Sequence, residues 1–147
     1  MEWFVRWFIR SALGWFGVGV VLGICMAFEP LTIRYRPAHV HANLLGFVAM
    51  MIFGVAYHVI PRFNGRPLHR RRWAEIHFWA ANSGLLLLVS GWILRMHVSA
   101  LGNWLVRGGS ALSAVGAFLF IANLWITLEP RRLETDERPG VSLPVRS

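Results

Sequence analysis

Cysteine and acidic residues are scarce in this chain. A single cysteine, Cys25, occurs among the 147 residues, so no internal disulfide can form and a metal–cysteine cluster is excluded. Because Cys25 lies inside an apolar stretch, we expect it to be a small buried hydrophobic side chain. The seven acidic residues lie in the termini and connecting segments. Without paired carboxylates in the apolar stretches, a Gly-x-Ser-x-Gly sequence or a phosphate-binding loop, nothing supports hydrolytic chemistry.

Charge of either sign is sparse, and lysine is absent. Only 15% of the residues are charged and 56% are hydrophobic, with eight Trp and ten Phe, which is typical of a membrane protein. All 15 basic residues are arginines, and the formal net charge is +8. These arginines lie between apolar stretches rather than on one face, so they indicate membrane orientation and not nucleic-acid binding.

Four apolar stretches predict an all-α, four-helix transmembrane bundle within residues 1–130. About 20 apolar residues at 1.5 Å each span roughly 30 Å of hydrocarbon, and each stretch reaches or approaches this length. Pro61 is expected to stop the second helix. A polar cytoplasmic tail, residues 131–147, is expected to follow. The predicted helices are Ala12–Phe28, His39–Ile60, Ile76–Leu94 and Gly108–Leu128. The aromatic segment Trp3–Ile9 could extend the first of them backwards.

The arginine distribution predicts the orientation in the membrane. Eleven arginines lie in the N-terminal segment, the second connection and the C-terminal tail, whereas four lie in the first and third connections. The positive-inside rule then places both termini in the cytoplasm, with the chain crossing the inner (cytoplasmic) membrane four times. Membrane lipid is therefore expected to contact the outward surfaces of the helices.

His39 and His41 open the second apolar stretch, at its predicted outer end. At about 100° per residue, positions i and i+2 point roughly 200° apart, so one helix cannot direct both rings at one metal ion. Two interpretations remain open: axial ligation of heme iron at two sites, or an interfacial pair hydrogen-bonded to lipid or loop carbonyls. Arg34 and Arg36 could pair with heme propionates or be ordinary interface arginines.

Three further residues are candidates for cofactor binding. His58 and His77 are both predicted near the cytoplasmic side, where they could hold a second heme or be interfacial side chains. His58 lies roughly 25 Å along the helix axis from His41, so it cannot share the outer site. Gly46 could either make a close helix contact or leave space for a flat cofactor.

One family resemblance sharpens these alternatives. The chain resembles the catalytic subunit of the heme–copper oxidase superfamily, in particular its C-type branch and the related nitric oxide reductases, over roughly Gly14 to Met96. The sequences that carry the likeness are Arg36-Pro37-Ala38-His39-Val40-His41, Tyr57-His58, Pro61-Arg62 and His77-Phe78-Trp79.

The resemblance implies a fold and a set of ligands. Those subunits have twelve helices in three groups of four, and this chain is similar to one group. The family's tenth helix carries a His-x-His pair that ligates two hemes, which implies His39 as the high-spin and His41 as the low-spin type of ligand. His39 also matches the low-spin ligand of the family's second helix, in its Arg-Pro-x-His setting. The third apolar stretch has Gly91-Trp92 where the family carries a pair of copper-ligating histidines, so copper is not expected.

The sequence therefore predicts a b-type membrane cytochrome that transfers single electrons. Because the two rings diverge, we expect His39 of one copy and His41 of a neighbour to share an iron in a homotrimer, or otherwise in a dimer. One alternative is a gas-binding heme enzyme or sensor with one histidine ligand. Another is a heme-free structural or assembly subunit of a respiratory complex.

Overall fold

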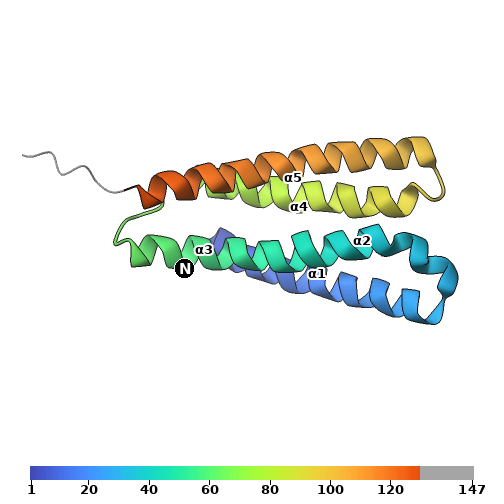
Figure 1. Ribbon diagram of the computed structural model, residues 1–147. Helices are drawn as coiled ribbons and strands as arrows, with labels where there is room; N and C mark the ends of the chain where they lie inside the picture. The colour runs from blue at the N-terminus through green and yellow to red at the C-terminus, as the bar shows by residue number, and fades with distance from the viewer. Residues whose placement is uncertain (130–147) are drawn as a thin grey trace, which may run out of the picture.

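The computed structural model describes residues 1–129, and these form four long helices (Figure 1). The predicted all-α, four-helix architecture is confirmed for this part of the chain, and all four helices are long and apolar enough to cross a membrane. The predicted tail, residues 131–147, lies outside the described residues. The elements are α1 (Trp3–Phe28), η1 (Pro30–Tyr35), α2 (Arg36–His41), η2 (Ala42–Ala49), α3 (Met50–Phe63), α4 (Arg71–Leu94) and α5 (Ser99–Leu128).

The helices are arranged as two antiparallel hairpins that lie side by side. One hairpin pairs α1 with the continuous helix made of α2, η2 and α3, and the other pairs α4 with α5 (Figure 1). The connection from α3 to α4 is fastened to the end of α5. Asn123 exchanges two hydrogen bonds with the backbone of Arg70, at 3.0 and 2.9 Å, and the Thr127 hydroxyl accepts one from the His69 N–H. Asn64, at the end of α3, also donates to the Thr127 carbonyl at 2.7 Å, so the two hairpins are joined at this end.

The helices are longer than the apolar stretches that predicted them. α4 begins at Arg71 instead of Ile76, and α5 at Ser99 instead of Gly108. α1 begins at Trp3, so it includes the aromatic segment Trp3–Ile9 as an extension of the apolar stretch. The physical reason is that hydrophobicity marks only the segment suited to lipid, whereas the helical backbone can continue into polar and aromatic residues at the interface.

The expectation that Pro61 stops the second helix is wrong. α3 includes Pro61 and ends at Phe63, after which the Asn64 N–H donates to the Ile60 carbonyl at 3.0 Å. Proline removes one N–H and crowds the carbonyl four residues earlier, which is tolerable so close to a helix end.

A π-helix, η2, interrupts the same long helix directly after His41. It extends over eight residues, whereas most π segments are single-turn bulges, and such segments are frequent at functional sites. Its wider turns change the angular spacing of the side chains that follow. No pattern in the sequence indicated this segment.

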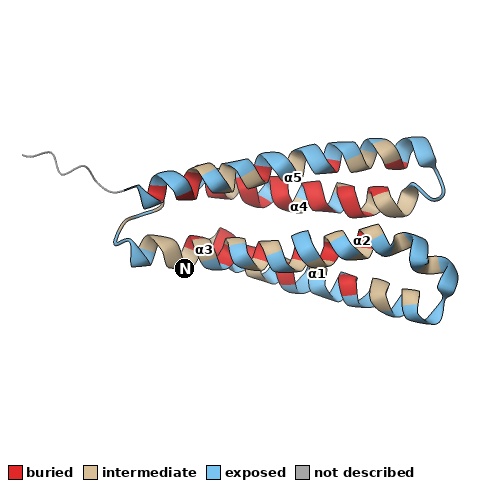
Figure 2. Ribbon diagram, in the orientation of Figure 1, coloured by how far each residue is buried: buried red, intermediate tan, exposed pale blue. Residues whose placement is uncertain are grey.

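α4 is the most buried helix of the bundle (Figure 2). Half of its most apolar segment is buried, against 11% for α1 and 22% for α5. The outward surfaces of α1 and α5 carry exposed large hydrophobic side chains such as Val21, Phe118 and Trp125, as expected of helices that face lipid. Cys25 is also exposed, so the expectation that it is buried is wrong. It lies on the outward side of α1, where hydrophobic character does not require burial within the chain.

Candidate functional site

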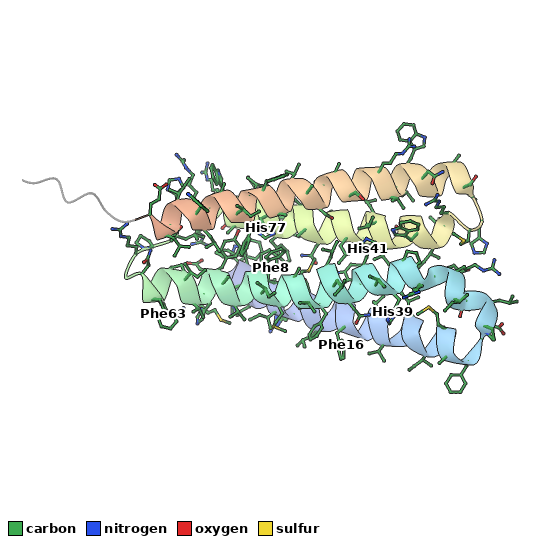
Figure 3. All side chains as sticks on the ribbon, viewed as in Figure 1. Phe8, Phe16, His39, His41, Phe63 and His77 are labelled. Atoms are coloured by element: carbon green, nitrogen blue, oxygen red, sulfur yellow. The ribbon has the colours of Figure 1, made fainter. Side chains whose placement is uncertain are left out.

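His39 projects from α2 toward α1 and is partly buried (Figure 3). Its Nδ1 lies 2.8 Å from the carbonyl oxygen of Gly19. A carbonyl can only accept, so Nδ1 carries the proton and donates, which leaves the lone pair on Nε2. Gly23 provides the space for the ring, since a Cβ at this position would lie 3.1 Å from His39 Cε1.

Asn43 supports the same histidine from one turn further along the helix. Its Nδ2 donates to the His39 carbonyl at 2.9 Å and lies 3.5 Å from Nε2 of the ring. The Asn43 side chain occupies the space where a Cβ of Gly19 would lie. Gly19 and Gly23, four residues apart on α1, therefore make a hollow filled by His39 and Asn43 of the same chain.

His41 faces α4 instead. Its Nδ1 donates to the Pro37 carbonyl at 2.7 Å, which again leaves the lone pair on Nε2. The ring lies nearly parallel to Trp92, with centroids 6.2 Å apart and planes inclined by 24°. The guanidinium of Arg95 lies 5.1 Å from the Trp92 ring. The predicted divergence is confirmed, since His39 faces α1 and His41 faces α4 (Figure 3).

The donor chemistry of both histidines fits axial ligation of a heme iron. Metal-ligating imidazoles commonly donate their other N–H to a carbonyl, which fixes the tautomer and orients the ring. Both rings are held in this way by backbone carbonyls of Gly19 and Pro37. Within residues 1–129, no cluster of three or more His, Cys, Asp or Glu side chains could hold a bare metal ion.

The other predicted residues of the outer site lie near the two histidines in the chain. Arg34 is exposed and its Nε donates to the Leu31 carbonyl at 2.7 Å, while Arg36 is exposed at the start of α2. The space beside Gly46 is occupied by the side chains of Trp15 and Leu85, so it makes a close helix contact rather than space for a cofactor. Of the two alternatives for Gly46, the structure therefore favours the close helix contact.

His77 lies in the core near the opposite end of the bundle and is fully buried. Its Nδ1 forms a hydrogen bond of 3.0 Å with the Tyr57 hydroxyl. Nε2 has no hydrogen-bond partner in the described part of the chain. The ring is surrounded by aromatic side chains, with centroid distances of 4.5 Å to Phe53, 4.9 Å to Phe8 and 5.5 Å to Phe120.

His58 has a different environment, although it neighbours Tyr57 in sequence. Its Nδ1 accepts a hydrogen bond of 2.6 Å from Arg62, and it lines a cavity of about 580 Å³ at the end of the bundle. The structure thus places His77 in the core and His58 on a cavity at the surface. Each ring has a different polar partner, and the two do not bond to each other.

Sequence reasoning missed the residues that orient the histidines. From the sequence alone, Trp92 was only a departure from a copper site, and Asn43 had no role. Trp92 acts through a contact between helices, and Asn43 through a contact across one helical turn beside the π-helix. No local sequence pattern predicted either contact. For Asn43, one signal was available: it follows His39 by four residues, a spacing at which two side chains of a helix can contact each other.

Comparison with known proteins identifies one matching family. The family described as Cytochrome C and Quinol oxidase polypeptide I matches residues 3–135. The chain is 31% identical over 93 residues to the Cbb3-type cytochrome c oxidase subunit CcoN1 of Stutzerimonas stutzeri, covering 58% of this chain and 20% of that protein. It is 26% identical to the cytochrome c oxidase subunit 1 of Rhodobacter capsulatus, covering 80% of this chain and 28% of that protein.

A third relative gives the same result. The bacteroid cytochrome c oxidase subunit 1 homolog of Bradyrhizobium diazoefficiens is 28% identical over 116 residues, covering 61% of this chain and 21% of that protein. The matched region spans about a quarter of the length of these relatives.

Proposed function

The chain belongs to the cytochrome c and quinol oxidase polypeptide I family, the subunit I of heme–copper oxidases, and on that premise we propose that it is a b-type heme protein that transfers single electrons. It is a multi-pass membrane protein. In this proposal His39 and His41 are the axial ligands. Heme, when bound, supplies one-electron chemistry at its iron.

The orientation of the two imidazoles is the observation that carries the proposal. Each Nδ1–H donates to a backbone carbonyl, at 2.8 Å for His39 and 2.7 Å for His41, so the lone pair of each ring is on Nε2. The His41 Nε2 has no hydrogen-bond partner within residues 1–129, and the one neighbour of the His39 Nε2 is the Asn43 amide nitrogen at 3.5 Å, which a metal would replace. Both rings are only partly buried, which leaves them accessible from outside the chain. Arg34 and Arg36, which precede the two histidines in the chain, would pair with the carboxylates at the heme edge.

The divergence of the rings supports a site shared between copies. His39 faces α1 and His41 faces α4, so one chain does not bring both rings to one iron. We therefore favour ligation by His39 of one copy and His41 of another, in a homotrimer or otherwise a dimer. The exposed hydrophobic side chains of α1 and α5 could contact other copies as well as lipid.

The arginine distribution supports a location in the inner membrane with both termini in the cytoplasm. His39 and His41 would then lie toward the outer surface. A second heme between His58 and His77 is the weaker part of the proposal, because the His77 ring is enclosed by aromatic side chains, whereas His58 lies on a separate cavity and bonds to Arg62.

The test is heme content of the purified protein, expressed with a heme precursor. A pyridine hemochrome assay, together with a protein-mass measurement, gives the hemes per chain. His39→Ala and His41→Ala should each lower heme content at least tenfold, because a ligand is lost. His97→Ala is the matched control, since that exposed ring bonds only to Tyr35 and should leave heme content unchanged.

The reduced spectrum separates the alternatives. Bis-histidine ligation occupies both axial positions, so carbon monoxide should change the spectrum little. An immediate shift would instead favour a gas-binding protein with one histidine ligand.

A heme-free structural subunit is the second candidate. It is favoured by the packing of His41 against Trp92, and neither the 580 Å³ cavity nor a smaller one of about 50 Å³ within the described residues is lined by His39 or His41. Absence of heme from the unaltered protein, with heme content and oligomeric state unchanged in both alanine variants, would establish that candidate.

A further inference from the structure

A cavity of about 580 Å³ opens at the end of the bundle where α1 and α4 begin and α3 ends. Its volume lies within the range of about 300–1,000 Å³ that is typical of ligand sites. Phe4, Val5 and Leu68 provide an apolar part of the lining, whereas His58, Arg62 and Arg66 provide a basic part. The cavity is therefore amphipathic, and it is far along the helix from the proposed heme ligands.

Arg62 and Arg66 carry charges that no acid balances within residues 1–129. Arg62 donates from one amino group to Nδ1 and the carbonyl of His58, at 2.6 and 2.8 Å. Arg66 donates from one amino group to the Glu129 carbonyl at 2.6 Å. The remaining N–H groups of both guanidinium groups make no hydrogen bond within the described residues, so they are available to an anion.

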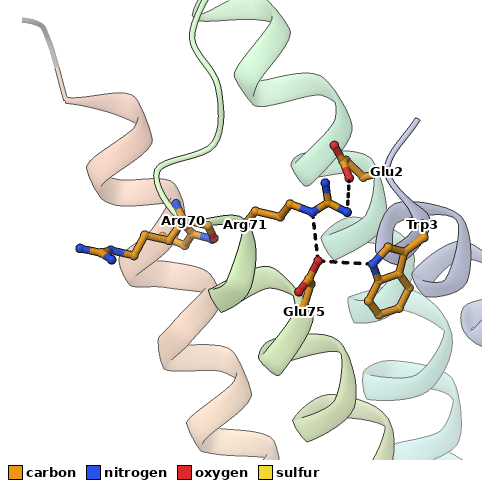
Figure 4. Close-up of polar contacts among 6 residues, drawn as sticks. Glu2, Trp3, Arg70, Arg71 and Glu75 are labelled. Atoms are coloured by element: carbon orange, nitrogen blue, oxygen red, sulfur yellow. Dashed lines mark hydrogen bonds and ion pairs between the residues drawn. The ribbon is translucent and has the colours of Figure 1, made fainter.

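Arg71 also lines the cavity, but its charge is paired with acidic side chains. It forms ion pairs with Glu2 at 3.2 Å and Glu75 at 3.0 Å, and Glu75 also accepts from the Trp3 indole N–H at 3.3 Å (Figure 4). Its charge is thus compensated within the chain. This ion-pair cluster ties the start of α1 to the start of α4 and fixes one wall of the cavity.

We propose that this cavity binds one acidic phospholipid. The phosphate would be held by Arg62 and Arg66, and the acyl chains would pass the partly exposed Pro61 and Leu68, beside the buried Phe4 and Val5. Basic pockets between transmembrane helices recognise anionic lipid headgroups. Guanidinium groups favour phosphate oxygens because they can donate two parallel hydrogen bonds. The apolar lining favours a lipid over free phosphate, because free phosphate would leave the apolar part of the cavity without a partner. The site goes beyond the proposed heme function and does not depend on it.

The experiment uses the full chain in a neutral detergent. Lipid binding is followed by native mass spectrometry and by the shift of the melting temperature on titration with phosphatidylglycerol, phosphatidylcholine or inorganic phosphate. We expect saturable binding of one phosphatidylglycerol per chain with a rise in melting temperature, and no rise with the other two ligands. This comparison needs no variant.

A pair of variants then locates the site. Arg62→Gln/Arg66→Gln should weaken phosphatidylglycerol binding about 30-fold, at about 1 kcal/mol for each arginine near an anionic lipid and 1.4 kcal/mol for each factor of ten. Arg70→Gln/Arg72→Gln removes the same charge at the same end of the bundle, but neither residue lines the cavity, and the affinity should change less than threefold. Circular dichroism checks that both variants keep their helices.

Three results would overturn the proposal. The first is equal binding of phosphatidylglycerol and phosphatidylcholine to the unaltered protein. The second is stabilisation by inorganic phosphate as large as that by lipid, which would indicate a free-phosphate site. The third is equal loss of affinity in both double variants, which would indicate diffuse surface attraction.

Discussion

The Tyr57 hydroxyl and Nδ1 of His77 form a buried hydrogen bond of 3.0 Å that joins α3 to α4. Tyr57 is 4% exposed and His77 is fully buried, so this polar pair connects the two hairpins inside an aromatic cluster. In such a setting a polar group without a partner is costly.

The first prediction concerns this pair. Tyr57→Phe leaves both nitrogens of His77 without a partner in the described part of the chain, so we expect it to destabilise the protein. His77→Phe removes the imidazole but strands the tyrosine hydroxyl. The double variant replaces both groups with apolar rings of similar shape. A double-mutant cycle on unfolding in detergent should give a coupling of about 0.6–1.7 kcal/mol. Additive effects of the two single changes would contradict a functional bond between them.

The second prediction concerns the approach of α4 to α5. A Cβ at Gly109 would lie 2.5 Å from the backbone nitrogen of Leu88 and 2.7 Å from the Gly84 carbonyl, so the two helices would have to separate. Gly109→Ala should therefore cost about 1–3 kcal/mol of unfolding free energy. Gly108→Ala is the matched control, since a Cβ there meets nothing within 4 Å. Comparison of thermal melting of the two variants tests this, and equal melting temperatures would contradict the close packing.

The third prediction concerns the hollow on α1 that holds His39. Gly23→Val places a branched side chain against the ring, because even a Cβ would lie 3.1 Å from Cε1. We expect the ring to be displaced and its bond to the Gly19 carbonyl broken, with a loss of heme of at least tenfold. Gly17→Val, with open space beside it, should retain heme. The measurement is heme per chain, and retention of heme in Gly23→Val would show that this hollow does not position the ligand.

The fourth prediction concerns the surface on which His41 lies. Trp92→Leu removes the parallel aromatic partner of the imidazole, a contact worth about 0.5–1.5 kcal/mol, so heme affinity should fall about two- to tenfold. Trp92→Leu also lowers the free energy of unfolding, because packing is lost. The indole nitrogen is buried without a partner within the described residues, so removing it offsets part of that decrease. Trp104→Leu, at a side chain that is 69% exposed, serves as the control. A heme affinity as high as that of the control would argue against a role for Trp92.

The candidate site shows how far local sequence can lead. The spacing of His39 and His41 was enough to predict diverging rings, because the helical period is a local property. It did not reveal that backbone carbonyls of Gly19 and Pro37 hold the two Nδ1 atoms. The Gly19 contact spans 20 residues of sequence, and Trp92 lies 51 residues beyond His41.

By itself the sequence determined four membrane-spanning helices and the family resemblance, because hydrophobic length and short motifs are encoded locally. It misjudged Pro61 and gave no sign of the π-helix at Ala42–Ala49, because hydrophobicity and residue type alone do not fix where a helix ends or where its turns widen. Only the tertiary structure showed that Tyr57 bonds to His77 and that Gly46 makes a close helix contact. It also showed that arginines without an acidic partner in the described residues line an amphipathic cavity. These features arise where separate helices meet, and the folded bundle alone decides which side chains share that space.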